Sequence, residues 1–166
     1  EIGMTKLDGL HSKEGGFSRT GSRTPMQWGP GPTKGFSKAR VDKLYLPVDR
    51  SPRAPTVQAQ EAEPGSLLNL VRALLALRAK LPALQGQGDF KVLHDGSLGK
   101  PLVFLRTAGR QRILVIIQPK KKPSSVRLKL TGAKAVTLLE DRCTLVKGGA
   151  GWTAKTQGVG YGIYAL

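Results

Sequence analysis

The sequence of 166 residues carries a formal net charge of +16, because 27 lysines and arginines outnumber 11 aspartates and glutamates. Hydrophobic residues make up 39%, enough for a core of ordinary size, whereas aromatic residues make up only 5%, which predicts an aliphatic core. The single cysteine, Cys143, excludes an internal disulfide and a cysteine-based zinc site, and His11 and His94 are too few and too separated to indicate metal binding. We therefore expect neither a metal nor a cofactor.

The positive charge allows two interpretations. Basic residues are spread from Lys6 to Lys155, with one dense run at residues 120–122. A spread of this kind is typical of a well-solvated surface, whereas a focused stripe would indicate nucleic acid or another polyanion. We favour the first interpretation and keep nucleic acid as the less favoured partner. No apolar run is long enough to cross a membrane and the N-terminus lacks a signal-peptide pattern, so a cytoplasmic protein without a membrane partner is expected.

Residues 1–65 contain few periodic segments. Glycine and proline clusters at residues 15–16, 29–32 and 51–52 mark turns, and only residues 43–48 look locally extended. A loop region of this length indicates either a functional surface or dependence on a neighbouring structure.

Residues 66–81 predict an amphipathic helix. Ser66 is a suitable N-cap and Pro82 ends the helix, because proline inside a helix removes a hydrogen bond and clashes with the preceding turn. Leucines recur at the helical period along one face, at Leu67, Leu70, Leu74, Leu77 and Leu81. We expect this face to be covered either by the preceding loops or by a second copy of the chain, in a homodimer through residues 66–81.

After Pro82 the pattern changes to short alternating runs separated by turn residues. Such regular spacing predicts a small antiparallel β-sandwich over about residues 88–166. The predicted strands are residues 89–94, 101–106, 111–117, 125–130, 135–139, 143–146, 151–155 and 161–166.

Residues 23–28, with the sequence RTPMQW, resemble a signature of the α-amylase family of glycoside hydrolases, in the branch of α-glucosidases, oligo-1,6-glucosidases and trehalose synthases. Further stretches agree with the family in order and approximate spacing: residues 1–4 (EIGM), 35–37 (GFS), 44–49 (LYLPVD), 66–84, 88–90 (GDF), 103–106 (VFLR) and 114–116 (LVI). The resemblance implies an α+β chain with three parts. Residues 1–65 would be a loop-rich remnant of the end of the catalytic TIM barrel, residues 66–82 the final barrel helix, and residues 83–166 the family's C-terminal β-sandwich domain.

The resemblance also implies that this chain alone is not catalytic. Members of the family use an aspartate nucleophile, a glutamate acid/base and a stabilising aspartate, all on barrel strands that precede the matching region. None of the 11 acidic residues follows a recognisable barrel strand: Glu61 and Glu63 precede the helix, and Glu140 and Asp141 are expected in a tight turn. We expect a C-terminal fragment of an α-glucosidase-like enzyme that supports fold or assembly and meets an α-glucoside only together with a complementary barrel chain.

Arg23 is the only site residue that the resemblance carries over, as a contact to the sugar. A guanidinium suits sugar hydroxyls because it donates several hydrogen bonds from a planar fork. The alternative is a loop ion pair with Asp42 or Asp49. Trp28 is expected to bury its ring in the loop, and Gly29 departs from the family, which usually has an aspartate there.

Two other functions stay open. A free-standing carbohydrate-binding module would stack sugar rings on Trp152, Tyr161 or Tyr164, although core positions are the simpler interpretation for all three. A polyanion-binding module would centre on residues 120–122 and Arg127.

Overall fold

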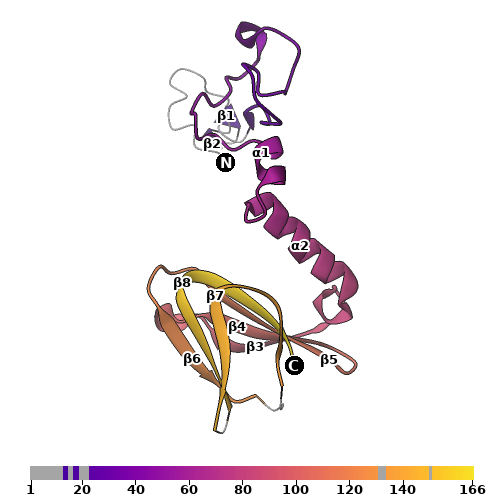
Figure 1. The fold of residues 1–166 in the computed structure, drawn as a ribbon, viewed down its shortest axis with the longest axis vertical. Helices are drawn as coiled ribbons and strands as arrows, with labels where there is room; N and C mark the ends of the chain where they lie inside the picture. The colour runs from indigo at the N-terminus through magenta and orange to yellow at the C-terminus, as the bar shows by residue number, and fades with distance from the viewer. Residues whose placement is uncertain (1–12, 15–16, 19–22, 131–133, 150) are drawn as a thin grey trace. The chain divides into compact units, whose positions relative to one another are not determined.

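The computed structural model describes residues 13–14, 17–18, 23–130, 134–149 and 151–166. The chain divides into two compact units, Glu1–Leu74 and Leu75–Leu166, and the boundary falls inside the longest helix (Figure 1). Among the described residues, no helix is long and apolar enough to cross a membrane. The domain limits expected at residues 65 and 82 stay predictions.

The first unit is mostly loop and turn, as the sequence predicted. Its regular elements are short: β1 (Lys13–Glu14) pairs with β2 (Phe17–Ser18), and η2 (Val41–Lys43) and α1 (Val57–Ala62) follow. Thr56 caps α1, since its side chain accepts a hydrogen bond from the backbone N–H of Ala59 at 3.2 Å. Helix α1 was not predicted, and residues 43–48, expected to be extended, form no strand.

Helix α2 (Leu67–Lys80) lies where the leucine period predicted it. Ser66 accepts a hydrogen bond from the backbone N–H of Asn69 at 3.2 Å, which confirms the N-cap. Pro82 opens the short turn η3 (Pro82–Leu84) and so ends the helix. No residue of α2 is buried. Leu70 and Leu77 are half-buried, whereas Leu67 is 70% exposed, so cover of this face by the preceding loops or by a second copy of the chain stays a prediction.

The second unit is built on one antiparallel six-stranded sheet. Its strands are β3 (Asp89–Asp95), β4 (Leu102–Ala108), β5 (Gln111–Gln118), β6 (Ser124–Leu128), β7 (Val136–Gly148) and β8 (Gly151–Ala165), with the turn η4 (Ser97–Gly99) between β3 and β4. The order is β3-β4-β5-β8-β6, and β7 also pairs with β8. The antiparallel β-domain is confirmed, whereas its description as a sandwich of two sheets is not.

Strand β8 joins the two halves of this sheet. Its first half pairs with β6 and its second half with β5, while β7 follows both halves. The bend lies at Gly158, whose φ of +111° favours glycine, and at Gly160, where a Cβ would lie 2.5 Å from the carbonyl oxygen of Asp141. In β7 the register shifts between Asp141 and Cys143. The prediction of four short strands and of a turn at Glu140 and Asp141 was wrong. Both residues pair with β8, at Gly162 and Tyr161, inside the long strand β7, and the bulge lies after them, at Arg142.

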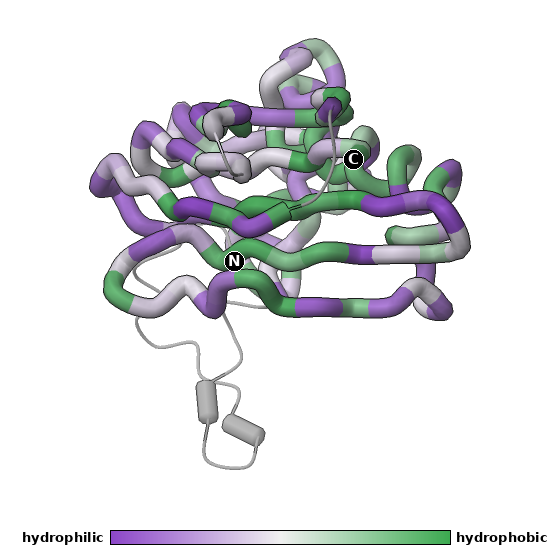
Figure 2. Tube along the Cα trace, turned by 90° about the horizontal axis from the view of Figure 1, so that it is seen from below, coloured by the Kyte–Doolittle hydropathy of each residue, from purple (hydrophilic) through white to green (hydrophobic). Residues whose placement is uncertain are grey.

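Two apolar clusters form the core of the second unit. The first joins both halves of the bent sheet and contains Val103, Leu114, Ile116, Val126, Leu128, Cys143, Trp152, Ala154 and Tyr164. The second contains Ala83, Ile113, Val115 and Ile163, against which Leu77 and Leu81 pack. Four consecutive residues of β5, 113–116, are buried because they alternate between the two clusters. Figure 2 shows hydrophobic stretches along the strands and hydrophilic stretches towards the loops.

Candidate functional site

The family-like motif is held against α1 in the first unit. The carbonyl oxygens of Gln27 and Trp28 accept hydrogen bonds from the backbone N–H groups of Val57 and Gln58, both at 2.9 Å. The N–H groups of Trp28 and Gly29 donate to the carbonyl oxygen of Lys34 at 2.8 and 3.1 Å, which closes the following loop. The motif therefore has a defined backbone within this unit.

Side chains alternate along the motif as in an extended strand. Pro25 and Gln27 are buried, whereas Met26 is 48% exposed and Trp28 is 52% exposed. The expectation that Trp28 buries its ring was wrong, because the backbone bonds to α1 direct the neighbouring Gln27 inwards instead. The side-chain oxygen Oε1 of Gln27 is buried and has no hydrogen-bond partner among the described residues. The side of the motif that carries Met26 and Trp28 is thus apolar and exposed within its unit.

Arg23 lies at the start of the motif and is exposed. Its two predicted ion-pair partners have other contacts: Asp42 pairs with Arg40 at 3.0 Å, and Asp49 accepts a hydrogen bond from the backbone N–H of Ser51 at 2.8 Å. Both the sugar-contacting role of Arg23 and the ion pair stay predictions.

The carboxylates of the described residues have structural contacts. Glu61 pairs with Arg72 at 2.7 Å and links α1 to α2. Hydrogen bonds from Ser97, first from its backbone N–H, lower the pKa of Asp95, which is exposed. No group of three histidine, cysteine, aspartate or glutamate residues among the described ones could hold a metal ion.

Glu140 and Asp141 are neighbours in β7 and both line a hollow beside Lys155. Glu140 accepts a hydrogen bond from the Tyr164 hydroxyl at 2.7 Å, and Asp141 pairs with Arg142 at 3.3 Å. Successive residues of a strand point to opposite faces, so the two carboxylates are not arranged as a facing pair.

Two of the three aromatic residues considered for sugar stacking lie in the core. Trp152 is 6% exposed and Tyr164 is 2% exposed, so their rings are not available to a ligand. Burial, reinforced by the hydrogen bond to Glu140, raises the pKa of Tyr164 well above its ordinary value of 10.0. Burial likewise raises the pKa of the Cys143 thiol, which makes it a poor nucleophile.

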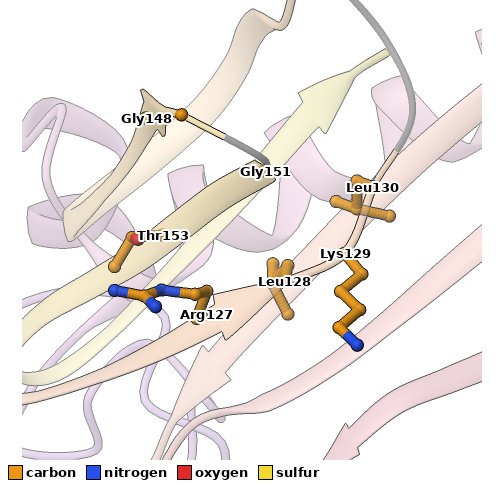
Figure 3. Close-up of a pocket in the computed structure, with 8 residues that line it drawn as sticks. Arg127, Leu128, Lys129, Leu130, Gly148, Gly151 and Thr153 are labelled. Carbon is orange, nitrogen blue, oxygen red and sulfur yellow. The ribbon is translucent and has the colours of Figure 1, made fainter.

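A further hollow lies in the β-domain at the end of β6 and next to the β7–β8 hairpin (Figure 3). Arg127 and Thr153 lie together on one side of it, Lys129 projects from the next outward position of the same chain segment, and Leu128 lies between them. The sequence had indicated Arg127 as part of a polyanion-binding region. The hollow itself depends on the pairing of β6 with β8, which local sequence patterns do not reveal.

Residues 1–87, just over half of the chain, match the family profile described as alpha amylase, catalytic domain. The chain belongs to the α-amylase family. Among relatives in this family, a trehalose synthase/amylase of Mycobacterium tuberculosis is 41% identical over 110 residues, covering 64% of this chain and 17% of that protein. A probable alpha-glucosidase of Rhizobium meliloti is 36% identical over 99 residues, covering 59% of this chain and 17% of that protein.

The fold is similar to part of a solved α-amylase-family structure. Trehalulose synthase MutB from Pseudomonas mesoacidophila MX-45 matches with a TM-score of 0.72 and 24% identity, over 89% of this chain and 26% of that one. The chain thus spans about a fifth of the length of its relatives, and the α-amylase-family resemblance inferred from residues 23–28 is confirmed.

Proposed function

We propose that this chain forms the C-terminal part of an α-glucosidase-like or trehalose synthase-like enzyme. Residues 1–65 would contribute the end of the catalytic barrel, α2 its final helix, and the bent sheet the family's C-terminal β-sandwich domain. The observation that carries this proposal is the match of residues 1–87 to a catalytic domain whose relatives are several times longer than the chain.

Exposed apolar side chains in the first unit support this function. Besides Met26 and Trp28, Phe36 is 50% exposed and Tyr45 is 80% exposed. In helix α2, Leu67 is 70% exposed and Leu75 is 60% exposed. Exposed apolar surface of this extent usually marks an interface. We propose that the remainder of the catalytic domain covers it.

The chain alone is proposed to have no glycosidase activity. Retaining glycosidases need two carboxyl groups about 5–5.5 Å apart on either side of the scissile bond. The described carboxylates instead pair with arginines, accept hydrogen bonds from backbone N–H groups of turns, or accept one from a side-chain hydroxyl, as Glu140 does from Tyr164. Maltose, isomaltose, sucrose and an aryl α-glucoside should therefore not be turned over, whereas turnover that disappears on mutating an acidic residue of this chain would overturn the proposal.

Arg23 is proposed to contact the non-reducing-end sugar once the barrel is complete. It is exposed and stands at the head of a motif whose backbone is fixed by α1. The fork of guanidinium N–H groups can bind two hydroxyls at once, which lysine cannot do with the same geometry. A complementary barrel chain is thus a required partner for this role.

A chimera tests the proposal directly. The segment of the Rhizobium meliloti relative that matches this chain is replaced by the whole chain, and hydrolysis of an aryl α-glucoside is compared with that of the truncated relative. The chimera should be soluble and active, and the truncated relative inactive. A chimera carrying Trp28→Ser and Leu75→Ser should lose assembly, whereas Lys91→Gln, on the exposed edge strand β3, should change nothing. An inactive, well-folded chimera would refute the proposal.

A homodimer through residues 66–81 is the second candidate for the isolated chain. The exposed leucines of α2 favour it, since a two-fold axis would cover the stripe of each copy with the stripe of the other.

A further inference from the structure

The two outer faces of the β-domain differ in what covers them. On one side, Ile113, Val115 and Ile163 pack against Leu77 and Leu81. The opposite side is formed by β6, the first half of β8 and the second half of β7, and here the outward side chains are exposed or half-exposed and, except for Val146, polar. We call this side the cationic face and define it by Ser125, Arg127, Lys129, Thr144, Val146, Thr153, Lys155 and Gln157.

Strand register fixes six members of the cationic face, and Lys129 and Gln157 follow Arg127 and Lys155 at the next exposed positions along the chain. Lys155 stands in the middle strand with Ser125 on one side and Thr144 on the other, and Thr153 likewise stands between Arg127 and Val146. Buried residues alternate with them, for example Leu128 and Ala154, which belong to the first apolar cluster. The cations are thus held on a rigid sheet whose inner side is core.

Positive charge is concentrated in this unit. Leu75–Leu166 contains 16 lysines and arginines but only four aspartates and glutamates. The three lysines at residues 120–122 border the cationic face, because a Cβ on Gly158 of β8 would lie only 2.8 Å from the carbonyl oxygen of Lys121. Together with Arg127, Lys129 and Lys155 they bring the number of cations on or beside the face to six.

Few carboxylates oppose this surface. Glu140 and Asp141 lie beside Lys155, but they accept hydrogen bonds from Tyr164 and Arg142 respectively. Within the described part of the chain, Arg127, Lys129 and Lys155 form no ion pair, so their charge is available to a partner.

We propose that the cationic face binds the phosphate backbone of duplex nucleic acid without sequence specificity. Lys129 directly follows the last residue of β6, two positions after Arg127, so the attachment points of the two side chains are about 7 Å apart and match a row of phosphates rather than one anion. Hydroxyl and amide groups between the cations, as on Ser125, Thr144 and Gln157, are the usual additional donors to phosphate oxygens. The hollow of Figure 3 gives the face a concave end beside Arg127.

The composition of the face distinguishes this partner from others. Single-stranded nucleic acid is usually held by stacking on aromatic rings, and the described residues of the cationic face include none. Binding to a membrane surface relies on inserted aromatic or apolar side chains, and Val146 is the single large apolar member here. We therefore expect single-stranded nucleic acid and a membrane surface to bind the cationic face more weakly than a duplex does.

The test measures binding of the 166-residue chain to a fluorescent 30-base-pair DNA duplex of mixed sequence by anisotropy between 50 and 200 mM NaCl. Log Kd should rise with log salt with a slope of about 5, because each of the six cations that neutralises a phosphate contributes about 0.9. In the triple variant Arg127→Gln, Lys129→Gln, Lys155→Gln the slope should fall by about 2.7, and affinity at 100 mM NaCl should fall more than about tenfold.

A control variant removes the same charge elsewhere. Lys91→Gln, Lys100→Gln, Arg110→Gln changes three exposed cations away from the face and should weaken binding less than about threefold. Circular dichroism checks that both variants fold. Equal loss in the two variants, no binding of the wild type at 50 mM NaCl, or tighter binding to vesicles of 70% phosphatidylcholine and 30% phosphatidylserine than to the duplex would each overturn the proposal.

Discussion

Two substitutions only two residues apart in α2 separate self-association from folding. Leu75 is 60% exposed, whereas Leu77 packs against the apolar cluster around Ile113. Aspartate at either position has the same intrinsic cost in a helix, so that term cancels in the comparison. Leu75→Asp should change the free energy of unfolding by less than about 0.5 kcal/mol, as an exposed position does. Leu77→Asp should lower it by about 2 kcal/mol or more, because it removes a core contact and brings a charge to the cluster.

The apolar surface of α2 that a dimer would bury determines how strongly Leu75→Asp should weaken dimerisation. Leu67, Val71, Leu74 and Leu75 are 70%, 43%, 37% and 60% exposed. Covering them completely buries about two side chains' worth of surface per copy, or about 3–6 kcal/mol before the cost of association. A dimer of this kind is weak, and losing Leu75 in both copies should cost about 2 kcal/mol or more, which is more than tenfold in Kd.

Sedimentation equilibrium between 10 and 300 μM measures the association, and urea unfolding measures the stability. A Trp28→Phe background leaves the buried Trp152 as the only tryptophan and so reports on the β-domain. The reasoning is refuted if the wild type is monomeric at every concentration, or if Leu75→Asp is as destabilising as Leu77→Asp.

Three further predictions concern the β-domain and the motif. Because burial raises the pKa of Tyr164 above 10.0, its contribution to stability is present below pH 10 and is lost as the pH rises further; Tyr164→Phe should flatten the decline in urea midpoint between pH 9 and pH 11. Gly160→Ala should lower the free energy of unfolding by about 2 kcal/mol or more, since its Cβ would clash with a backbone carbonyl, whereas Gly148→Ala, with open space around it, should lower it by less than about 0.5 kcal/mol. Arg23→Ala should leave thermal unfolding unchanged and raise KM of the active chimera, and Arg23→Lys should not rescue it; a large loss of stability would favour the ion pair instead.

The sequence predicted those elements whose limits depend on local chemistry. Helix α2 is one, because Ser66 and Pro82 act on their own neighbours and the leucine period needs no partner to be recognised. Helix α1 escaped prediction because its six residues, VQAQEA, have no apolar stripe and depend on the Thr56 cap and on hydrogen bonds to Gln27 and Trp28. The sequence analysis divided the long strands β7 and β8 at Asp141 and Gly158 because these residue types usually mark turns. Only the pairing of β8 with β7, β6 and β5 carries both strands through these positions, and that pairing is a long-range property.

The candidate sites also depend on long-range contacts that local sequence patterns do not reveal. RTPMQW identified the family, but whether Trp28 is buried depends on what lies over it, which six consecutive residues do not specify. The positive charge was interpreted as a solvated surface because the basic residues are spread along the sequence. Alternation in β6 and β8 then places Arg127 and Lys155 on one side of the sheet, and Lys129 is exposed just after β6, so a charge that is diffuse in sequence becomes focused in the fold.

The two proposals use different surfaces and therefore make different demands on the chain. Assembly with a catalytic barrel depends on apolar side chains of the first unit and of α2, and should change little with rising salt because hydrophobic burial is not screened. Duplex binding depends on the cations of β6 and β8 and should weaken steeply over the same range of salt. The cationic face is also the side of the β-domain that Leu77 and Leu81 do not cover. A chain that bound a barrel through one surface would for that reason still present the other to a polyanion, and an assembled chimera should retain the DNA affinity of the isolated chain.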